Sequence, residues 1–356
     1  MKYKADWEET KERFKAWWAH DNTGRCALNV TAPKENPPDI KEPLRPDTPL
    51  ERWTDLDYMH ELGDYRNSRT FYGGEAFPVW SYGYPGNKRL GAFLGCEVSL
   101  KFNTGWLEPV LNEEDITFQD LAIDEENEYW KFTLEWLKRG AKESKGISIP
   151  SIGAFGGSGD TLAAVRGTDR LLYDVMDRPD QVKEADLYCM DLWIRVYDRF
   201  YEIIKDSAQG STCWFNLWSP GKFYASQNDF SYMISTEMFE ELFIPTIRKQ
   251  TDFLDHSVFH VDGIGAFKHV GVLCELANLQ AFQILPGAGK PSPLHYMDVL
   301  KQVQAAGKNL HISIPASEVE TALSELSALG LFISTSCKTE QEAKDLLRNA
   351  EKWSKF

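Results

Sequence analysis

The sequence lacks the cysteine pattern of a disulfide-stabilised or zinc-finger protein. Its 356 residues include 6 cysteines, spread from Cys26 to Cys337, and no two of them form a Cys-x-x-Cys pair. Cysteines so far apart in a chain of this length are typical of reduced thiols. We therefore expect no disulfide framework.

Positive charge and long hydrophobic runs are also scarce. The chain has 39 lysines and arginines against 54 aspartates and glutamates, a net charge of −15. An acidic surface disfavours nucleic acid and anionic membranes as partners. No apolar run approaches the roughly 18 residues that cross a bilayer, and the opening MKYKADWEETKERF has no apolar signal-peptide core. We expect a folded cytoplasmic protein that acts on a small molecule.

Internal repeats and a dinucleotide-binding motif are missing as well. No period of 20 to 50 residues recurs, which excludes solenoids and propellers. The glycine-rich stretch GAFGGSGD at 153–160 does not match G-x-G-x-x-G at the start of a helix. The fold must therefore come from an alternation of single strands and helices.

Short β-rich runs alternate with longer amphipathic stretches along the chain. The eight runs are CALNVT (26–31), AFPVWSYG (76–83), ISIPSIG (147–153), TCWFNLW (212–218), SVFHVD (257–262), QAFQIL (280–285), NLHISI (309–314) and LFISTS (331–336). The main helical stretches are 124–144, 178–208, 235–254, 294–306 and 338–352. This order predicts βαβ units, and eight of them favour a single α/β domain, a (β/α)₈ TIM barrel.

The N-terminal part adds two features to this barrel. Residues 5–20 place four aromatic side chains on one helical stripe, which predicts a helix before the first strand. Six prolines in 33–50 predict a loop that makes an excursion over the barrel mouth. The expected single domain thus covers 1–356, with the helix, first strand and loop in 1–70 and the rest of the barrel in 71–356.

A candidate metal site lies at the ends of two predicted strands. His260 and Asp262 are two residues apart on one strand, so both side chains project from the same face. Cys337 follows another strand and precedes a helix, where a thiol pKa is expected to be lowered. Imidazole, carboxylate and thiolate together form a three-ligand site with an open position. The alternative is a hydrogen-bonded core histidine with a nearby aspartate.

Further polar and aromatic residues lie close to the predicted strand ends. Asp160, Asp229 and His311 are candidate catalytic residues, although the two aspartates also fit helix or turn caps and His311 also fits core packing. Flat side chains, together with one acidic group, predict a binding surface for a large or planar substrate. These candidate substrate-binding residues are Glu75, Trp80, Trp214 and Trp218, and packing between strands is the alternative for each tryptophan.

Five segments resemble the uroporphyrinogen decarboxylase superfamily, and most strongly its branch of corrinoid-dependent methyltransferases. They are GDTLAAVRGTDRLLYDVMDRPDQV (159–182), SQNDFSYMISTEMFEELFIPTI (226–247), HVDG (260–263), PGAGKPSP (286–293) and STSCKTEQEA (334–343). The resemblance covers roughly residues 70–350, and STEMFEELFIP is its most specific piece. It implies a single (β/α)₈ barrel.

The resemblance also implies a chemistry. In the methyltransferase branch a His-x-Cys pair and a distant cysteine hold zinc, which activates a thiol toward a corrinoid-bound methyl group. His260 matches that histidine, Cys337 matches the distant cysteine, and Asp262 stands where the middle cysteine would be. A carboxylate in place of a thiolate makes the site harder and leaves the metal a stronger Lewis acid, so zinc, iron and manganese all remain candidates.

Three functions follow from this reading. The first is a metal-dependent methyltransferase that activates a heteroatom of a small molecule, with zinc or another divalent metal at His260, Asp262 and Cys337 and a corrinoid supplied by a partner protein. The second is a decarboxylase, or a carbohydrate-acting lyase or hydrolase, on the same barrel. Decarboxylation of uroporphyrinogen ranks lower because the basic segment near the N-terminus offers only Arg25. The third is a non-catalytic protein that binds a small molecule or a corrinoid.

Overall fold

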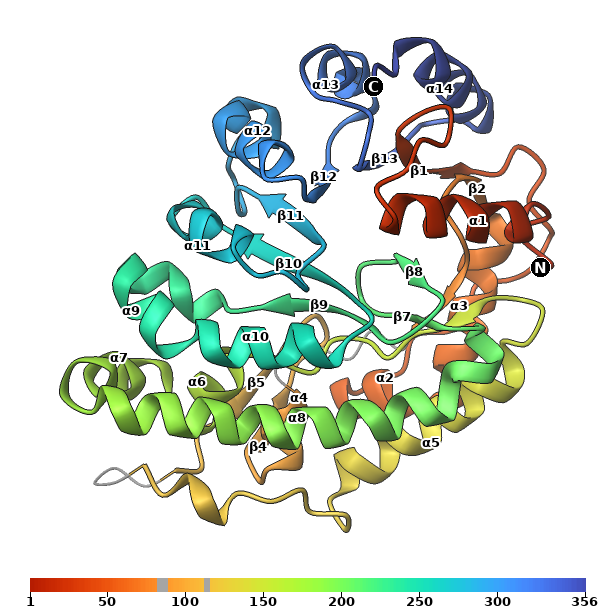
Figure 1. Ribbon diagram of the computed structural model, residues 1–356. Coiled ribbons are helices and arrows are strands. Elements are labelled where there is room, and N and C mark those ends of the chain that lie inside the picture. The colour runs from red at the N-terminus through yellow and green to blue at the C-terminus, as the bar shows by residue number, and fades with distance from the viewer. Residues whose placement is uncertain (82–88, 112–115) are drawn as a thin grey trace.

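The computed structural model describes residues 1–81, 89–111 and 116–356 and has a mixed α/β fold around one central sheet (Figure 1). The sheet has seven strands, and only β2 is antiparallel to its neighbour. In spatial order they are β2 (Thr70–Gly74), β1 (Ala27–Pro33), β13 (Leu331–Ser336), β12 (Asn309–Ser313), β11 (Ala281–Leu285), β10 (His256–Asp262) and β9 (Phe223–Gln227). The prediction of an α/β fold with a mostly parallel sheet is confirmed.

Burial on both faces explains why these segments form parallel strands. Most residues of β9 to β12 are buried, and β-branched and aromatic side chains fill much of them. Such near-continuous apolar runs are typical of strands covered on both sides. The predicted strands at 26–31, 257–262, 280–285, 309–314 and 331–336 coincide with five members of the sheet.

The remaining strands are short pairs outside this sheet. They are β3 (Val79–Trp80) with β6 (Ile149–Pro150), β4 (Glu97–Leu100) with β5 (Gly105–Glu108), and β7 (Ser211–Thr212) with β8 (Trp218–Ser219). The runs at 76–83 and 147–153 thus contain only two strand residues each, and residues 82 and 83 lie outside the described part. Over the described residues, the hydrogen-bonded ladder of strands does not close into a barrel. Outside the central sheet, the Ile152 amide after β6 donates to the Thr212 carbonyl of β7 at 3.0 Å.

One strand prediction is wrong. Residues 212–218 do not form a sheet strand, because the chain turns back after β7 and Asn216 adopts a positive φ of 54°. The strand that pairs with β10 on the side away from β11 is β9, which the sequence pattern did not indicate. Its residues FYASQ are all buried, but they follow a Ser-Pro-Gly turn and carry polar groups that weaken the β signal.

Helices flank the sheet and connect its strands (Figure 1). They are α1 (Trp7–Trp18), α2 (Pro49–Thr54), α3 (Leu56–Arg69), α4 (Arg89–Phe93), α5 (Glu128–Glu143), α6 (Asp160–Arg166), α7 (Thr168–Asp177), α8 (Pro179–Ala208), α9 (Thr236–Leu242), α10 (Ile244–Phe253), α11 (Val270–Cys274), α12 (Met297–Ala305), α13 (Val319–Glu325) and α14 (Glu340–Trp353). The helix expected over 235–254 is divided at Phe243, because Pro245 cannot continue the hydrogen-bond ladder of α9.

Helix α1 covers the end of the sheet where the strands begin. Its aromatic stripe is buried, and Phe14 stacks on Phe332 at the start of β13 with ring centroids 5.9 Å apart. The Trp17 indole donates to the Gly330 carbonyl, and the Trp18 indole donates to the Trp218 carbonyl. This end is therefore closed by core packing, which leaves the carboxyl ends of the strands for a site.

The proline-rich segment leaves the sheet at that carboxyl end. Residues 34–48 have no helix or strand of their own, as the prolines predict. The segment is held at its start by the Glu35 amide, which donates to Glu340, and the Arg45 guanidinium lies 4.0 Å from the Phe102 ring centre. Within the described chain, no helix has both the length and the apolar character to cross a membrane.

Candidate metal centre at the carboxyl ends of the strands

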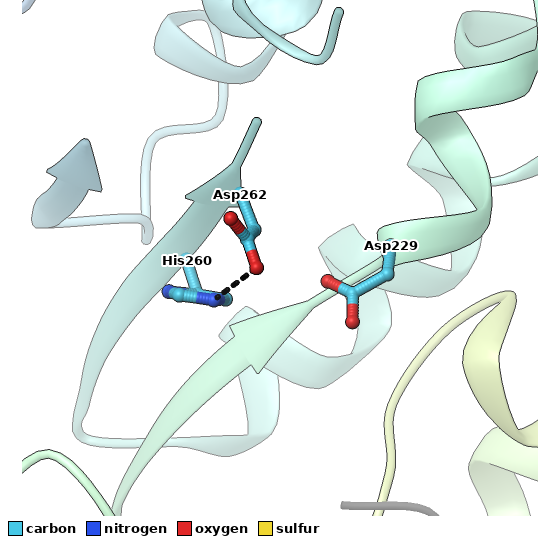
Figure 2. Close-up of side chains that lie close together, drawn as sticks. All are labelled: Asp229, His260 and Asp262. Carbon is cyan, nitrogen blue, oxygen red and sulfur yellow. Dashed lines mark ion pairs between the residues drawn. The ribbon is translucent and has the colours of Figure 1, made fainter. Parts of the chain in front are cut away.

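Two members of the candidate site lie on β10. His260 is buried, with 8% of its side chain exposed, whereas Asp262 at the last position of the strand is 39% exposed. The two side chains share one face of the strand, and His260 Nε2 lies 3.7 Å from Asp262 Oδ2 (Figure 2). A single cation bridges ligand atoms roughly 3 to 4 Å apart at normal bond lengths.

The neighbouring strand supplies the third member, Asp229. Register pairs Gln227, the last residue of β9, with His260. Two residues later the chain enters a 3₁₀ turn, η2 (Asp229–Met233), which places the Asp229 carboxylate beside the other two groups (Figure 2). One ligand atom from each of Asp229, His260 and Asp262 lies within 4.8 Å of the others. We call these three residues the Asp/His/Asp group.

A neighbour across the sheet orients the His260 ring. Gln283 on β11 is paired with His260 in register, and its Oε1 lies 2.5 Å from His260 Nδ1. Because an amide oxygen only accepts hydrogen bonds, this contact places the ring proton on Nδ1 and the lone pair on Nε2, on the Asp262 side. Metal-bound histidines are commonly oriented in this way. Gln283 was not among the residues predicted from the sequence, although a polar residue inside the apolar run QAFQIL was the available signal.

Buried carboxylates hold the backbone that carries Asp229. Asp160 Oδ1 accepts from the Asp229 amide at 2.8 Å, and its Oδ2 accepts from Gln227 Nε2 at 2.6 Å. The N-cap position of α6 is Gly159, one residue before Asp160, and Asn228 is the residue that caps η2 from its own N-cap position. Asp160 is fully buried and acts on the Asp/His/Asp group by positioning Asp229.

A second buried acid, Asp186 on α8, fixes the glycine-rich loop before Asp160. It accepts from the Gly159 amide and the Ser158 hydroxyl, both at 2.7 Å. Burial raises the pKa of Asp186 from 3.8 to about 6, and the Asp160 charge adds to the increase against the hydrogen bonds that lower it. No sequence signal separated Asp186 from the other acidic residues of this long helix.

The raised pKa predicts a pH dependence of stability. An acid that binds its proton more tightly when folded stabilises the folded state below its unfolded pKa, and this contribution is lost as pH rises through the folded value. Between pH 3.8 and about 6, we expect the free energy of unfolding of the natural chain to fall by about 2 kcal/mol relative to Asp186→Asn. Urea unfolding of both proteins across this range measures the difference, and parallel curves would contradict it.

Cys337 does not join the Asp/His/Asp group, which corrects the predicted ligand set. The Cys337 amide donates to the Thr31 carbonyl, and the residue lines a separate cavity of about 440 Å³ with Lys34 and Arg69. The expected helix N-terminus is also absent at this position, since Thr339 caps α14. Burial, with a smaller effect of Glu342, raises the pKa of the thiol instead of lowering it.

A cavity of about 750 Å³ opens beside His260. It lies over the carboxyl ends of several strands, and Trp214, Phe215, Gln283 and His311 are among the residues that line it. The rings of Trp214 and Phe215 meet the His260 ring edge to face, with centroids 4.9 and 5.4 Å away. This volume fits a small-molecule ligand.

His311 lines the cavity as a neutral ring. Its Nε2 lies 2.8 Å from the Ser334 hydroxyl, and the ring packs against Phe215 and Phe332. Burial, and next the nearby His260, lower the pKa of His311 to about 3. The ring therefore carries no positive charge near pH 7.

Three predicted substrate-binding residues lie away from this cavity. Trp80 packs against Trp136 of α5, and Trp218 is buried at the α1 end, where its indole donates to the Ala208 carbonyl. Glu75 is fully buried and pairs with Arg25 near the start of β1. Of the four predicted residues, only Trp214 reaches the cavity, because the others belong to the hydrophobic core or to the opposite end of the sheet.

The fold and the site define an α/β protein with a candidate metal group at the carboxyl ends of parallel strands. A solved structure with this fold is a methyltransferase from Methanosarcina mazei, with a TM-score of 0.65 over 96% of this chain and 98% of that chain. The two sequences are 12% identical, so the likeness shows the shared fold. No protein-family model and no curated protein matches the sequence.

Proposed function

We propose that the chain is a metal-dependent methyltransferase on a (β/α)₈ barrel related to the uroporphyrinogen decarboxylase superfamily. The observation that carries the proposal is the convergence of Asp229, His260 and Asp262 beside a ligand-sized cavity. The fold shared with a methyltransferase from Methanosarcina mazei supports the reaction class. Both features lie where enzymes with parallel strands form their active sites.

The donor set fits a divalent metal. One imidazole nitrogen and two carboxylates suit zinc, manganese or iron(II), and the two acidic charges offset those of the cation. Bound there, the metal would supply Lewis acidity to a heteroatom of the substrate. Three protein ligands leave coordination positions for that heteroatom.

The surrounding residues would prepare this centre for the substrate. Gln283 directs the Nε2 lone pair of His260, and Asp160 fixes the backbone of Asp229, so two ligands are held before the metal binds. The rings of Trp214 and Phe215 shield one side of His260 and would exclude water from the reacting heteroatom. In this proposal the methyl group would come from a corrinoid carried by a separate protein.

The decarboxylase alternative finds less support. Arg25, the cation expected to grip a carboxylate-rich substrate, donates to Glu75 at 2.8 and 2.9 Å, at the end of the sheet opposite the cavity. A polyanionic porphyrinogen needs clustered cations at its binding site. The lyase or hydrolase alternative predicts turnover without metal.

Methyl transfer from free methylcobalamin to 2-mercaptoethanol tests the proposal. We expect the zinc-reloaded chain to consume methylcobalamin, followed by its visible absorbance, and to lose the activity after chelation. Asp262→Asn and Asp229→Asn should each lower the rate by roughly a hundredfold, because each removes an anionic ligand. Asp206→Asn is the matched control, since Asp206 is exposed near the end of α8.

The outcome separates the candidate functions. Activity that survives chelation and both ligand substitutions would overturn the metal-dependent mechanism. A chain that retains metal but transfers no methyl group to any thiol would remove the methyltransferase assignment and leave a metal-binding protein.

A further inference from the structure

We infer that a second cleft, beside helix α8, binds a small amphiphilic anion with one carboxylate on an apolar body. The cleft has a volume of about 410 Å³ and is lined by α8, by α5 and by the chain segment 121–125; we call it the α8 cleft. Helices α5 and α8 pack side by side (Figure 1). Among the described residues, its lining shares none with the cavity beside His260. The inference therefore goes beyond the proposed methyl transfer.

Much of the wall of the α8 cleft is apolar. Trp130 of α5 and Leu192 of α8 are buried and form part of its floor. Ile123 and Leu134 are half-buried, so parts of their side chains stay within reach of a ligand. Side chains of this kind contact the carbon atoms of a ligand, and the volume is that of a small-molecule site.

Two arginines lie on the face of α8 that lines the cleft. At 3.6 residues per turn, one arc of about 100° holds Tyr188, Leu192, Arg195, Val196 and Arg199. The Tyr188 hydroxyl donates to the Leu121 carbonyl at 2.9 Å, so this arc faces the segment 121–125. Arg195 and Arg199 are both exposed. Because positions i and i+4 are neighbours on a helix, the two guanidinium groups can reach one anion.

Neither arginine has a counter-charge in the part of the chain that the structure describes, where neither guanidinium forms an ion pair or a hydrogen bond. Two acids one helical turn away have other partners. Asp191 pairs with Lys249 at 2.6 Å, and Glu202 pairs with Lys205 at 2.7 Å. Like charges at i and i+4 destabilise a helix. In a chain of net charge −15, two adjacent arginines without a partner therefore indicate a place for an anion from outside the chain.

A third ionisable group of the cleft sets the charge of the ligand. Glu125 is exposed on the segment 121–125 and also lines the cleft. Two cations and one carboxylate leave a single net positive charge, which a monoanion neutralises and a dianion exceeds. A planar guanidinium donates two parallel hydrogen bonds to a carboxylate. A carboxylate is therefore the monoanionic head group that suits this pair of arginines.

Octanoate, with its head group and its chain varied separately, tests the inference. 1-Octanol keeps the chain without the charge, octylammonium reverses the charge, and butyrate keeps the head group with four fewer methylene groups. Each compound is titrated into the full chain by isothermal calorimetry. We expect octanoate to bind with one-to-one stoichiometry, 1-octanol to bind roughly tenfold more weakly, butyrate roughly a hundredfold more weakly, and octylammonium not at all.

Substitution of each charge separates the α8 cleft from the rest of the surface. Arg195→Gln and Arg199→Gln should each weaken octanoate binding roughly tenfold, because each removes a charge-assisted hydrogen bond. Glu125→Gln should strengthen binding about twofold, as expected for one exposed charge. Arg248→Gln is the matched control, since Arg248 is exposed on α10 and does not line the cleft. Equal binding of octanoate and 1-octanol, or octanoate binding that both α8 substitutions leave unchanged, would overturn the inference.

The presence or absence of zinc keeps this site apart from the proposed metal centre. A carboxylate also binds metal ions, so the octanoate titration is repeated on the zinc-loaded chain, on the chelator-treated chain and on His260→Ala. We expect the same affinity in all three. Octanoate binding that requires zinc or His260 would place the probe at the metal centre and overturn the inference. Equal affinity in a chain that retains no metal would support the α8 cleft and refute only the proposed metal chemistry.

Discussion

Replacing His260 by alanine is expected to abolish tight metal binding, whereas Cys337→Ala should leave it unchanged. His260 is the nitrogen donor of the Asp/His/Asp group, and its removal leaves two carboxylates with a weak preference for zinc. We expect the apparent zinc affinity to fall by at least roughly a hundredfold, or about 3 kcal/mol. Competition against a fluorescent zinc chelator measures the affinity, and the visible spectrum of the cobalt-loaded chain reports the ligand set.

The Cys337→Ala variant decides between the two ligand sets, because only one of them contains the thiol. The structure places Cys337 at a separate cavity, with the thiol pKa raised, so a cobalt spectrum without a thiolate charge-transfer band is expected from the protein alone. His295→Ala is the matched histidine control, because His295 is exposed, lies outside the Asp/His/Asp group and has its Nδ1 3.3 Å from the Ser292 carbonyl. Loss of metal in Cys337→Ala would restore the ligand set predicted from the sequence.

Among the substitutions proposed for this protein, Glu75→Ala is expected to cause the largest loss in the free energy of unfolding. The Glu75 carboxylate is fully buried and accepts from Arg25, from Arg13 and from the Leu28 amide. Burial alone would raise its pKa, but Arg25 and then Arg13 outweigh burial and hold the pKa below its usual value. Glu75 is therefore charged in the folded protein, and its removal leaves Arg25 buried without its counter-charge.

Loss of one partner from a buried ion pair typically costs about 3 to 5 kcal/mol. We expect Glu75→Ala to lower the free energy of unfolding by that amount in urea titrations, with Glu75→Gln intermediate because it keeps the shape and one acceptor. Glu12→Ala is the control: Glu12 is 2.7 Å from Lys15 but exposed, and such pairs contribute less than about 1 kcal/mol. An equal loss of unfolding free energy in Glu75→Ala and Glu12→Ala would contradict the larger contribution expected of the buried ion pair.

The position of Glu75 also shows the limit of assigning function from residue type. Glu75 lies among aromatic and glycine residues that suggested a binding surface, and nothing local indicated its partners. Arg13 comes from α1 and Arg25 from the segment before β1, 62 and 50 residues away along the chain. Long-range pairing of opposite charges made it a structural residue at the closed end of the sheet.

Local periodicity accounts for what the sequence determined about this protein. The two-residue repeat of a strand is enough to place His260 and Asp262 on one face, and β-rich runs between amphipathic stretches are enough to predict a mostly parallel α/β sheet. Both patterns depend on residues a few positions apart, so they can be recognised without knowing which strands pair in the fold. β9 escaped prediction because its strand character comes from burial between β10 and the surrounding helices.

Only the tertiary structure decided which residue stands beside His260 and Asp262. Register between β9 and β10 brings Asp229 to them across about thirty residues of chain, while β13 ends before Cys337 and leaves that thiol at another cavity. Strand register and the point where a strand stops are set by packing of the whole sheet, which no spacing within a segment encodes. The same packing left Trp214 at the cavity and buried Trp218 at the opposite end.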